Sequence, residues 1–391
     1  MAQPLQLTEI VKHSGSMSIG KSKTSKMTRY FLLVTGNIVI FGLILVVVEG
    51  IASYMLAVRD IMTTYAAPES AERRHTKYDP DLGWVNEPSV QIVDMYGSGV
   101  YLRTNSQGFR NNHEFDTAVP NGKYRIICSG DSFTLGYGVD NDHTWCQLLT
   151  SLDPRFETVN MGQGGYGIDQ MYLWYKRDGT KFEHQVHLLA FIAADFDRMQ
   201  SDTFGGYGKP VIDIENRTLV VKNVPVPRPA YAYKGPNLSP LRTVELSRRV
   251  YRKLGFARDN RSPIEKKRNE RTQEVLTKIF EDLKRLNEER SSKLVLVYLP
   301  NQHELIGKGP QEWIQFIDKQ SRDLGIPLIN VLSTFRSSLP QRHAVKMFIP
   351  EGQLNYAAAA GHLNDQGNEL VAQIIYQELK NNPAISAMLQ E

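Results

Sequence analysis

The chain has 391 residues, of which 41 % are hydrophobic and 23 % charged, a composition that suits one large core or two smaller ones. The net charge is +4, and between Arg248 and Arg290 acidic residues alternate with basic ones, which predicts a solvated helix face and no nucleic-acid partner. The only cysteines, Cys128 and Cys146, have no zinc-binding spacing and make no disulfide framework. We expect buried thiols, with one disulfide between them as the alternative.

The amino-terminal part of the chain contains a long apolar run. From Tyr30 to Val48 there are 19 residues without a charge, and nine more uncharged residues follow Glu49 up to Val58. At 1.5 Å per residue the first run alone nearly spans a hydrocarbon core of about 30 Å. The run is too long for a signal peptide and lacks the polar face of a core helix. It predicts a transmembrane anchor at residues 30–58.

Charges flanking the anchor predict its orientation. The residues just after it supply only Arg59 and Asp60, whereas four basic residues precede it: Lys21, Lys23, Lys26 and Arg29. The positive-inside rule then places residues 1–29 in the cytoplasm and the rest of the chain outside. We therefore expect a single-pass protein of the inner (cytoplasmic) membrane with an extracytoplasmic, periplasmic domain.

Residues 59–122 predict a linker followed by an irregular segment that leads into the main domain. Thr63 to Arg74 is polar and small, and two later stretches, "YDPDLGW" (78–84) and "YLRTNSQGFRN" (101–111), place turn residues beside short β-prone runs.

From Lys123 to the end, short apolar runs alternate with helical patterns, which predicts an α/β domain with a parallel sheet covered on both faces. The expected strands are 124–128, 156–162, 184–193, 293–300 and 326–332, and the expected helices are 144–152, 170–177, 263–290, 311–324 and 366–379. The domain, residues 123–391, carries an insertion at 201–262 with a hairpin turning at Asn216, which we interpret as a lid or substrate-contacting flap.

Ligands in an open α/β sheet gather at the carboxyl ends of the strands. The first strand delivers "SGDSFTLGYG", which places Ser132 at the start of a helix, where its hydroxyl is exposed and backbone N–H groups face a developing oxyanion. His362 lies just ahead of the last helix. A serine at such a turn with a distant histidine fits a nucleophile and its general base.

Three blocks together, "GDSFTLGYG", "NMGQGG" and "GHLNDQGN", resemble the SGNH/GDSL hydrolase family from about Arg125 to the C-terminus. The resemblance implies a flavodoxin-like, three-layer α/β/α domain and an acyl-ester hydrolase or acyltransferase that needs no metal or organic cofactor. It also implies Ser132 as nucleophile, His362 as base, and the N–H groups of Ser132 and Gly165 as oxyanion donors.

Two blocks depart from the family pattern. Ala194 stands where the third block has an asparagine oxyanion donor, and Ala359 stands where the fifth block has the aspartate that orients the histidine. We expect a backbone carbonyl or another carboxylate to hold His362, with Asp195 the leading side chain because it follows the third strand. The remaining candidates are Asp365 and Glu351, with Asp131 expected to bond the turn and His303 a rival base.

The sequence thus predicts a membrane-anchored extracytoplasmic serine esterase that acts through Ser132 and His362 on an acylated carbohydrate, a lipid or a small ester. One alternative is an O-acyltransferase that modifies an envelope polysaccharide. The other is a weakly active or inactive binding protein that keeps the fold, which Ala194 and Ala359 favour.

Overall fold

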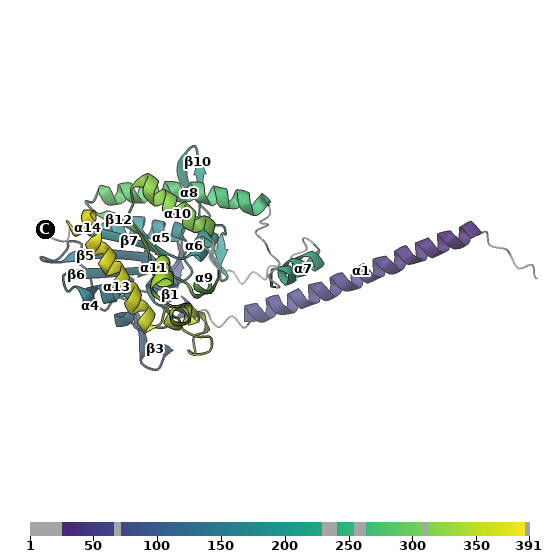
Figure 1. Cartoon of the computed structure of the whole chain (residues 1–391), viewed down its shortest axis with the longest axis horizontal. Coiled ribbons are helices and arrows are strands. Elements are labelled where there is room, and N and C mark those ends of the chain that lie inside the picture. The colour runs from purple at the N-terminus through teal and green to yellow at the C-terminus, as the bar shows by residue number, and fades with distance from the viewer. Residues whose placement is uncertain (1–25, 66–71, 229–240, 254–262, 308–310, 388–391) are drawn as a thin grey trace, which may run out of the picture. The chain divides into compact units, whose positions relative to one another are not determined.

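The computed structural model describes residues 26–65, 72–228, 241–253, 263–307 and 311–387 (Figure 1). Most of the predicted cytoplasmic segment and parts of the predicted insertion lie outside these residues. The chain divides into two compact units, one comprising residues 1–64 and 236–258 and the other residues 65–235 and 259–391. The described elements of the first unit are two helices, α1 (Lys26–Tyr65) and α7 (Arg242–Lys253).

A five-stranded parallel sheet forms the centre of the second unit. Its strands follow one another across the sheet in the order β13-β12-β7-β5-β6. Numbered along the chain this order is 2-1-3-4-5, the flavodoxin-like arrangement, so the expected fold class is confirmed. The strands are β5 (Tyr124–Gly130), β6 (Phe156–Gly162), β7 (Val186–Phe191), β12 (Lys293–Tyr298) and β13 (Leu328–Asn330).

Helices cover both faces of this sheet (Figure 1). α4 packs against α13, which also contacts α11, whereas α8 packs against α5 and α10. The second group lies above the sheet in the view of Figure 1 and the first group lies in front of and below it. The bounds are α4 (Trp145–Leu152), α5 (Ile168–Arg177), α8 (Pro263–Glu288), α10 (Gln311–Leu324), α11 (Val331–Ser338) and α13 (Asp365–Asn381).

Because helices cover both faces, the central strands are buried along their length and read as continuous apolar runs. Every residue of β7 is buried, and so is every residue of β12 after Lys293. Cys128 on β5 and Cys146 on α4 are free buried thiols, as expected. The five strands and five helices predicted from residue 123 onward are all present, with ends that shift by a few residues.

The segment predicted to be irregular contains two antiparallel hairpins. A short helix, α2 (Glu72–His75), precedes the pair β1 (Thr76–Asp79) and β2 (Gly83–Asn86), and β3 (Gln91–Gly97) pairs with β4 (Val100–Arg103). We call residues 72–115 the lead-in segment.

Within the predicted insertion, the hairpin expected at Asn216 is present. β10 (Val211–Glu215) pairs with β11 (Thr218–Lys222), and Asn216 and Arg217 have φ angles of 50° and 65°, which are typical of a tight hairpin turn. A smaller pair, β8 (Thr203–Phe204) and β9 (Tyr207–Gly208), precedes it.

Short helical turns fill the remaining connections. They are α3 (Ser132–Leu135), η1 (Asn141–His143), η2 (Gly179–Lys181), α6 (Ala193–Arg198), α9 (Gln302–Ile306), α12 (Gln341–Ala344), η3 (Val345–Met347), η4 (Ala357–Ala359) and α14 (Pro383–Ser386).

Candidate active site

Ser132 is the first residue of α3, directly beyond the carboxyl end of β5. The preceding Asp131 caps this turn, since its Oδ1 accepts a hydrogen bond from the N–H of Phe133 at 2.9 Å. Gly130 has to be glycine, because a Cβ there would lie 1.9 Å from Thr134 Oγ1. The tight strand-to-helix turn therefore places Ser132 at the carboxyl end of β5, as the sequence predicts. Ser132 is only 4 % exposed, however, so the expectation of an exposed hydroxyl is wrong.

His362 lies beside this hydroxyl although 230 residues separate the two along the chain. Its Nε2 is 2.7 Å from Ser132 Oγ. The main chain of His362 makes two hydrogen bonds: its carbonyl oxygen accepts from the N–H of Ile349 at 2.8 Å, and its N–H donates to the carbonyl oxygen of Ala359 at 3.0 Å. The geometry is that of a serine with a general base within proton-transfer reach.

Aromatic rings flank the imidazole of His362, whose Nε2 meets Ser132 Oγ. Its Nδ1 is buried and has no hydrogen-bond partner among the described residues. The ring centroid lies 4.4 Å from that of Phe133, with an interplanar angle of 31°, and 5.1 Å from that of Tyr137. The carboxylate predicted for Nδ1 is therefore absent among the described residues, and the backbone carbonyls of Ala359 and Ala360 raise the pKa of His362 without hydrogen-bond geometry to Nδ1. Packing against two aromatic faces fixes the ring instead, and such faces also attract a cation.

Asp195 does not orient His362, which corrects the prediction for this residue. It lies in the first turn of α6, where its Oδ2 accepts from the N–H of Ile192 at 3.0 Å and its Oδ1 pairs with Arg198. Arg198 also bonds Asp131 Oδ2 at 3.0 Å. Burial and the nearby Asp131 raise the pKa of Asp195 well above its usual range, against the lowering effect of Arg198. Asp195 thus belongs to a buried ion cluster with Asp131 and Arg198.

The surroundings of His362 make it a neutral, weak base at pH 7. Burial lowers the pKa of His362 to about 4, although the charge of Asp131 raises it in part. Arg198 lowers this pKa further, and the carbonyl oxygens of Ala359 and Ala360 raise it, without either carbonyl having hydrogen-bond geometry to Nδ1. A neutral ring can accept the Ser132 proton, but the resulting imidazolium has no direct carboxylate partner.

The position of the absent acid is filled by apolar packing. Ala359 is fully buried in a small cluster that includes Tyr137, Ile349 and Tyr356. A Cβ at the neighbouring Gly138 would lie 3.3 Å from the Ala359 Cβ, so the space around this side chain is narrow. The other carboxylates proposed for the role lie at the surface. Asp365 is the exposed first residue of α13, whose N-cap is Asn364, and Glu351 is exposed in a turn.

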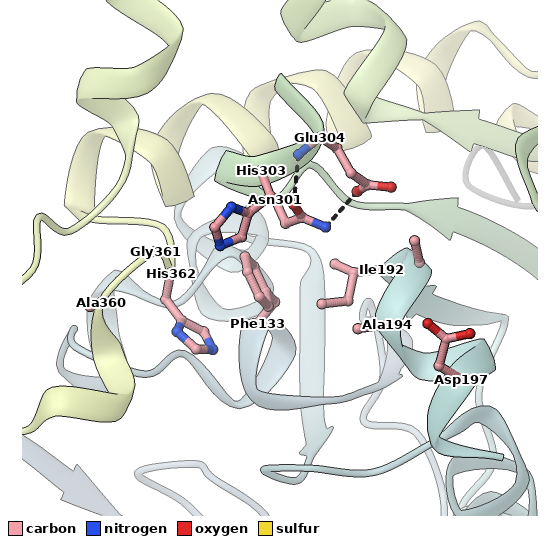
Figure 2. Close-up of a pocket in the computed structure, with 11 residues that line it drawn as sticks. Phe133, Ile192, Ala194, Asp197, Asn301, His303, Glu304, Ala360, Gly361 and His362 are labelled. Atoms are coloured by element: carbon pink, nitrogen blue, oxygen red, sulfur yellow. Dashed lines mark hydrogen bonds between the residues drawn. The ribbon is translucent and has the colours of Figure 1, made fainter. Parts of the chain in front are cut away.

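Two backbone N–H groups suit an oxyanion. Among the described residues, neither the Ser132 N–H nor the Gly165 N–H donates a hydrogen bond to any acceptor. Gly165 has a φ of +76°, and a Cβ there would lie 2.3 Å from the ring of Phe204, so only glycine fits. Ala194 lines the pocket without a side-chain donor (Figure 2). Gly165 therefore stays a predicted donor, and the third donor of the family pattern is missing.

A pocket of about 420 Å³ opens beside His362 (Figure 2). Asn301 is held in place by Glu304, whose N–H donates to Asn301 Oδ1 at 2.9 Å and whose Oε2 accepts from Asn301 Nδ2 at 2.6 Å. His303, the rival base, is exposed and lines the same pocket, but the partner of Ser132 is His362. The lining consists of Phe133, Ile192, Ala193, Ala194, Asp197, Asn301, His303, Glu304, Ala360, Gly361 and His362.

The lead-in segment braces these loops, a role that sequence reasoning missed. The guanidinium of Arg110 is fully buried and donates to the carbonyl oxygens of Leu135, Gly136 and Val139, at 2.5, 2.5 and 2.6 Å. These carbonyls follow Ser132 directly, so Arg110 fixes the loop that ends α3. The only signal in the sequence was an arginine within the turn-rich stretch "NSQGFRN".

The second family-like block is braced in the same way. Trp84 Nε1 donates to the carbonyl of Gly164 at 2.9 Å, and the Tyr166 hydroxyl donates back to the carbonyl of Trp84. Asn160 Nδ2 donates to the carbonyl of Thr134 at 2.8 Å and so ties this block to α3.

No protein-family model matches the chain, and no curated protein matches it. Among solved structures the chain is similar to an acetyl xylan esterase, with a TM-score of 0.39 and 15 % identity over 65 % of this chain and 98 % of that one. It is also similar to a lipase/acylhydrolase from Enterococcus faecalis, with a TM-score of 0.36 and 13 % identity over 66 % of this chain and 95 % of that one. A third similar structure is a member of the lipolytic G-D-S-L family from Veillonella parvula. Its TM-score is 0.36, and it is 11 % identical over 66 % of this chain and 100 % of that one. These values are too low to carry an argument about activity, so the chemistry rests on the side chains of this protein.

Proposed function

We propose that this protein is a membrane-anchored, extracytoplasmic serine esterase that removes acyl groups from an acylated glycan, a lipid or a small ester. The observation that carries the proposal is the contact of 2.7 Å between His362 Nε2 and Ser132 Oγ beside an open pocket.

In the proposed reaction, Ser132 Oγ attacks the ester carbonyl while His362 Nε2 takes the hydroxyl proton. The carbonyl oxygen becomes an oxyanion, which the N–H groups of Ser132 and Gly165 receive. His362 then gives its proton to the alkoxide that leaves, and an acyl-enzyme on Ser132 remains. Water, deprotonated by His362, attacks this ester and releases the carboxylic acid.

Two missing groups make the expected rate low. Losing one oxyanion donor costs about 10²–10³ in kcat. No carboxylate bonds Nδ1 among the described residues, so the imidazolium relies on the rings of Phe133 and Tyr137, the charge of Asp131 and two nearby backbone carbonyls. We therefore expect slow turnover rather than none, since nucleophile, base and two donors are retained.

The membrane part of the proposal rests on α1. The large apolar side chains from Met27 to Met55 are exposed along this helix, and Lys26 and Arg29 precede the uncharged run. Exposed apolar surface of this extent suits a lipid environment. An alkaline phosphatase fused after Glu391 should be active, and an inactive fusion with an active cytoplasmic reporter would refute the orientation.

An O-acyltransferase is the second candidate, because the pocket offers polar groups that could seat an acceptor hydroxyl. Asp197, Asn301 and His303 are among the residues that line it (Figure 2). In this case a sugar hydroxyl, deprotonated by His362, replaces water in the second half of the reaction.

The test uses the full chain purified in detergent. Wild type should hydrolyse a short-chain aryl ester, and Ser132→Ala and His362→Ala should lose this activity with little change in thermal stability. Exposed residues provide matched controls, Ser337→Ala and His343→Ala, which should keep it. Faster acyl release with an oligosaccharide, together with an acylated sugar in the mass spectrum, would favour transfer. A wild type that is inactive with and without acceptor would favour the binding protein and refute both catalytic proposals.

A further inference from the structure

Glu49 is a charged residue within the apolar part of α1, and its carboxylate has specific partners on another helix. It accepts hydrogen bonds from the N–H of Arg242 at 2.5 Å, the N–H of Thr243 at 3.1 Å and the hydroxyl of Thr243 at 2.7 Å. These N–H groups belong to the first turn of α7, where a helix has no internal acceptors and favours a negative charge. Glu49 thus caps α7 from a neighbouring helix.

Two side chains that follow Glu49 on α1 are also buried. Ala52 and Leu56 are each 2 % exposed, whereas the large apolar side chains before them on α1 are all exposed. Glu49, Ala52 and Leu56 lie three and four residues apart and therefore share one helix face. On α7, Thr243 and Leu246 are half-buried. The Glu49 hydrogen bonds therefore join the first turn of α7 to α1 at the end of the apolar run.

The outward side of α7 is uncharged where the structure describes it. Val244, Ser247 and Val250 follow one another at intervals of three residues and are all exposed, and Leu241, just before the helix, is 63 % exposed. The helix sequence, RTVELSRRVYRK, contains five basic residues and one acidic residue. Two exposed valines, one helical turn to either side of a small serine, on a strongly basic helix favour a place in a membrane interface.

The length of α1 sets the depth at which this contact occurs. The uncharged run from Tyr30 to Val48 measures about 28 Å as a helix, close to the thickness of a hydrocarbon core. With Arg29 at one boundary, Glu49 reaches the opposite boundary. The first turn of α7 then lies at the level of the lipid headgroups, where basic side chains meet phosphates.

We propose that α7 is an interfacial helix that binds the outer surface of the membrane, with Val244 and Val250 toward the acyl chains and with a basic composition that favours anionic headgroups. Glu49 holds it there. The inference rests on the proposed membrane anchor. It implies that the catalytic unit is attached to the bilayer twice, through α1 and through the insertion, which favours ester substrates presented at the membrane surface.

The test places an environment-sensitive fluorophore (NBD) on single added cysteines in the full chain, reconstituted in phosphatidylcholine nanodiscs that contain a spin-labelled lipid. Because both native cysteines are buried, unmodified protein serves as the labelling blank. The label at Val250→Cys should be quenched, as should one at Ile40→Cys within α1, whereas Ser337→Cys should stay bright. Adding phosphatidylglycerol, an anionic lipid, should increase the quenching at position 250 and leave it unchanged at the other two positions.

The possible outcomes test the interfacial helix α7 separately from the membrane anchor α1. Quenching at position 40 without quenching at 250 would overturn the interfacial helix and leave the anchor intact, whereas no quenching at 40 would overturn the anchor itself. Glu49→Leu should reduce the quenching at 250, and Glu49→Gln, whose amide oxygen still accepts, should largely keep it. Unchanged quenching in Glu49→Leu would show that Glu49 does not hold the helix.

Discussion

His362 shows what happens when a catalytic-type histidine loses its usual carboxylate. Two aromatic rings, those of Phe133 and Tyr137, fix the orientation of the imidazole. They do not supply a full negative charge, and burial lowers the pKa of His362 to about 4. A base whose pKa lies well below the working pH accepts a proton less readily, so the proposed reaction is slow for an electrostatic reason.

Restoring the acid tests this explanation. Ala359→Asp should place a carboxylate near Nδ1, raise the pKa of His362 and increase kcat at pH 7 by at least about tenfold, since the triad aspartate is worth up to about 10⁴. The pH profile of kcat/KM should show its midpoint moving upward from about 4. Ala359→Asn is the matched control, because it can accept a hydrogen bond without adding charge. A folded Asp variant with an unchanged profile would contradict the explanation.

At the residue scale the sequence predicted the reactive pair but not what surrounds it. Ser132 and His362 follow from a turn motif and a C-terminal motif, both of which are local. Asp195 was misassigned because its position beyond β7 was visible, whereas its partners were not: the N–H of Ile192 and the side chain of Arg198 engage it within its own helical turn. The orienting rings, Phe133 and Tyr137, lie inside the "GDSFTLGYG" block itself, but nothing in the sequence shows that they pack against His362.

At the scale of elements, the lead-in segment supports the site, although it supplies no reacting group. The guanidinium of Arg110 alone satisfies several carbonyls of the loop after α3, and it also bonds Asn141 Oδ1 at 2.9 Å. A fully buried cation with oxygen partners on all sides is costly to disturb, because each partner would be left without a donor.

Arg110→Met should therefore lower the free energy of unfolding by at least about 3 kcal/mol, and it should reduce turnover because the loop after Ser132 loses its support. Urea unfolding and aryl-ester hydrolysis measure the two effects. Arg103→Met is the matched control from the same segment, since Arg103 is exposed, and it should change stability by no more than about 0.5 kcal/mol. Equal stability of the two variants would refute the bracing role.

Elements buried on both faces were predictable, because such strands appear as unbroken apolar runs. The hairpin at Asn216 was predictable because Asn tolerates a positive φ. The hairpins of the lead-in segment were not, since β1, β2 and β4 have only four residues each and turn residues are interspersed among the apolar ones. Their stability comes from contacts such as Trp84 Nε1 with the Gly164 carbonyl, which lies 80 residues away.

At the scale of the whole molecule, buried histidines link folding to pH. Burial lowers the pKa of His75 to about 4, and it also lowers the pKa of His184 and of His187. The unfolded chain then binds more protons than the folded one between the lowered and the ordinary pKa values, so stability should fall as the pH drops below about 6.5. Asp195 and Glu304, whose pKa burial raises, act in the opposite sense.

A comparison of variants isolates the contribution of His75. His75→Gln keeps an amide near Asn86 Oδ1, which His75 Nδ1 approaches at 3.3 Å, but it cannot titrate. Between about pH 7 and about pH 5, wild type should lose about 2 kcal/mol more than this variant in the free energy of unfolding. Urea unfolding of the full chain in detergent at both pH values checks this, with the exposed His343→Gln as control. An equal loss in wild type and His75→Gln would refute the linkage.

The central claim is that Ser132 is a nucleophile activated by His362, and covalent labelling tests it most directly. Membranes that contain the full chain are treated with a fluorophosphonate, and the modified peptide is identified by mass spectrometry. We predict one adduct, on Ser132, that is absent in Ser132→Ala and strongly reduced in His362→Ala. An unlabelled wild type, or an adduct on a different serine, would contradict the claim.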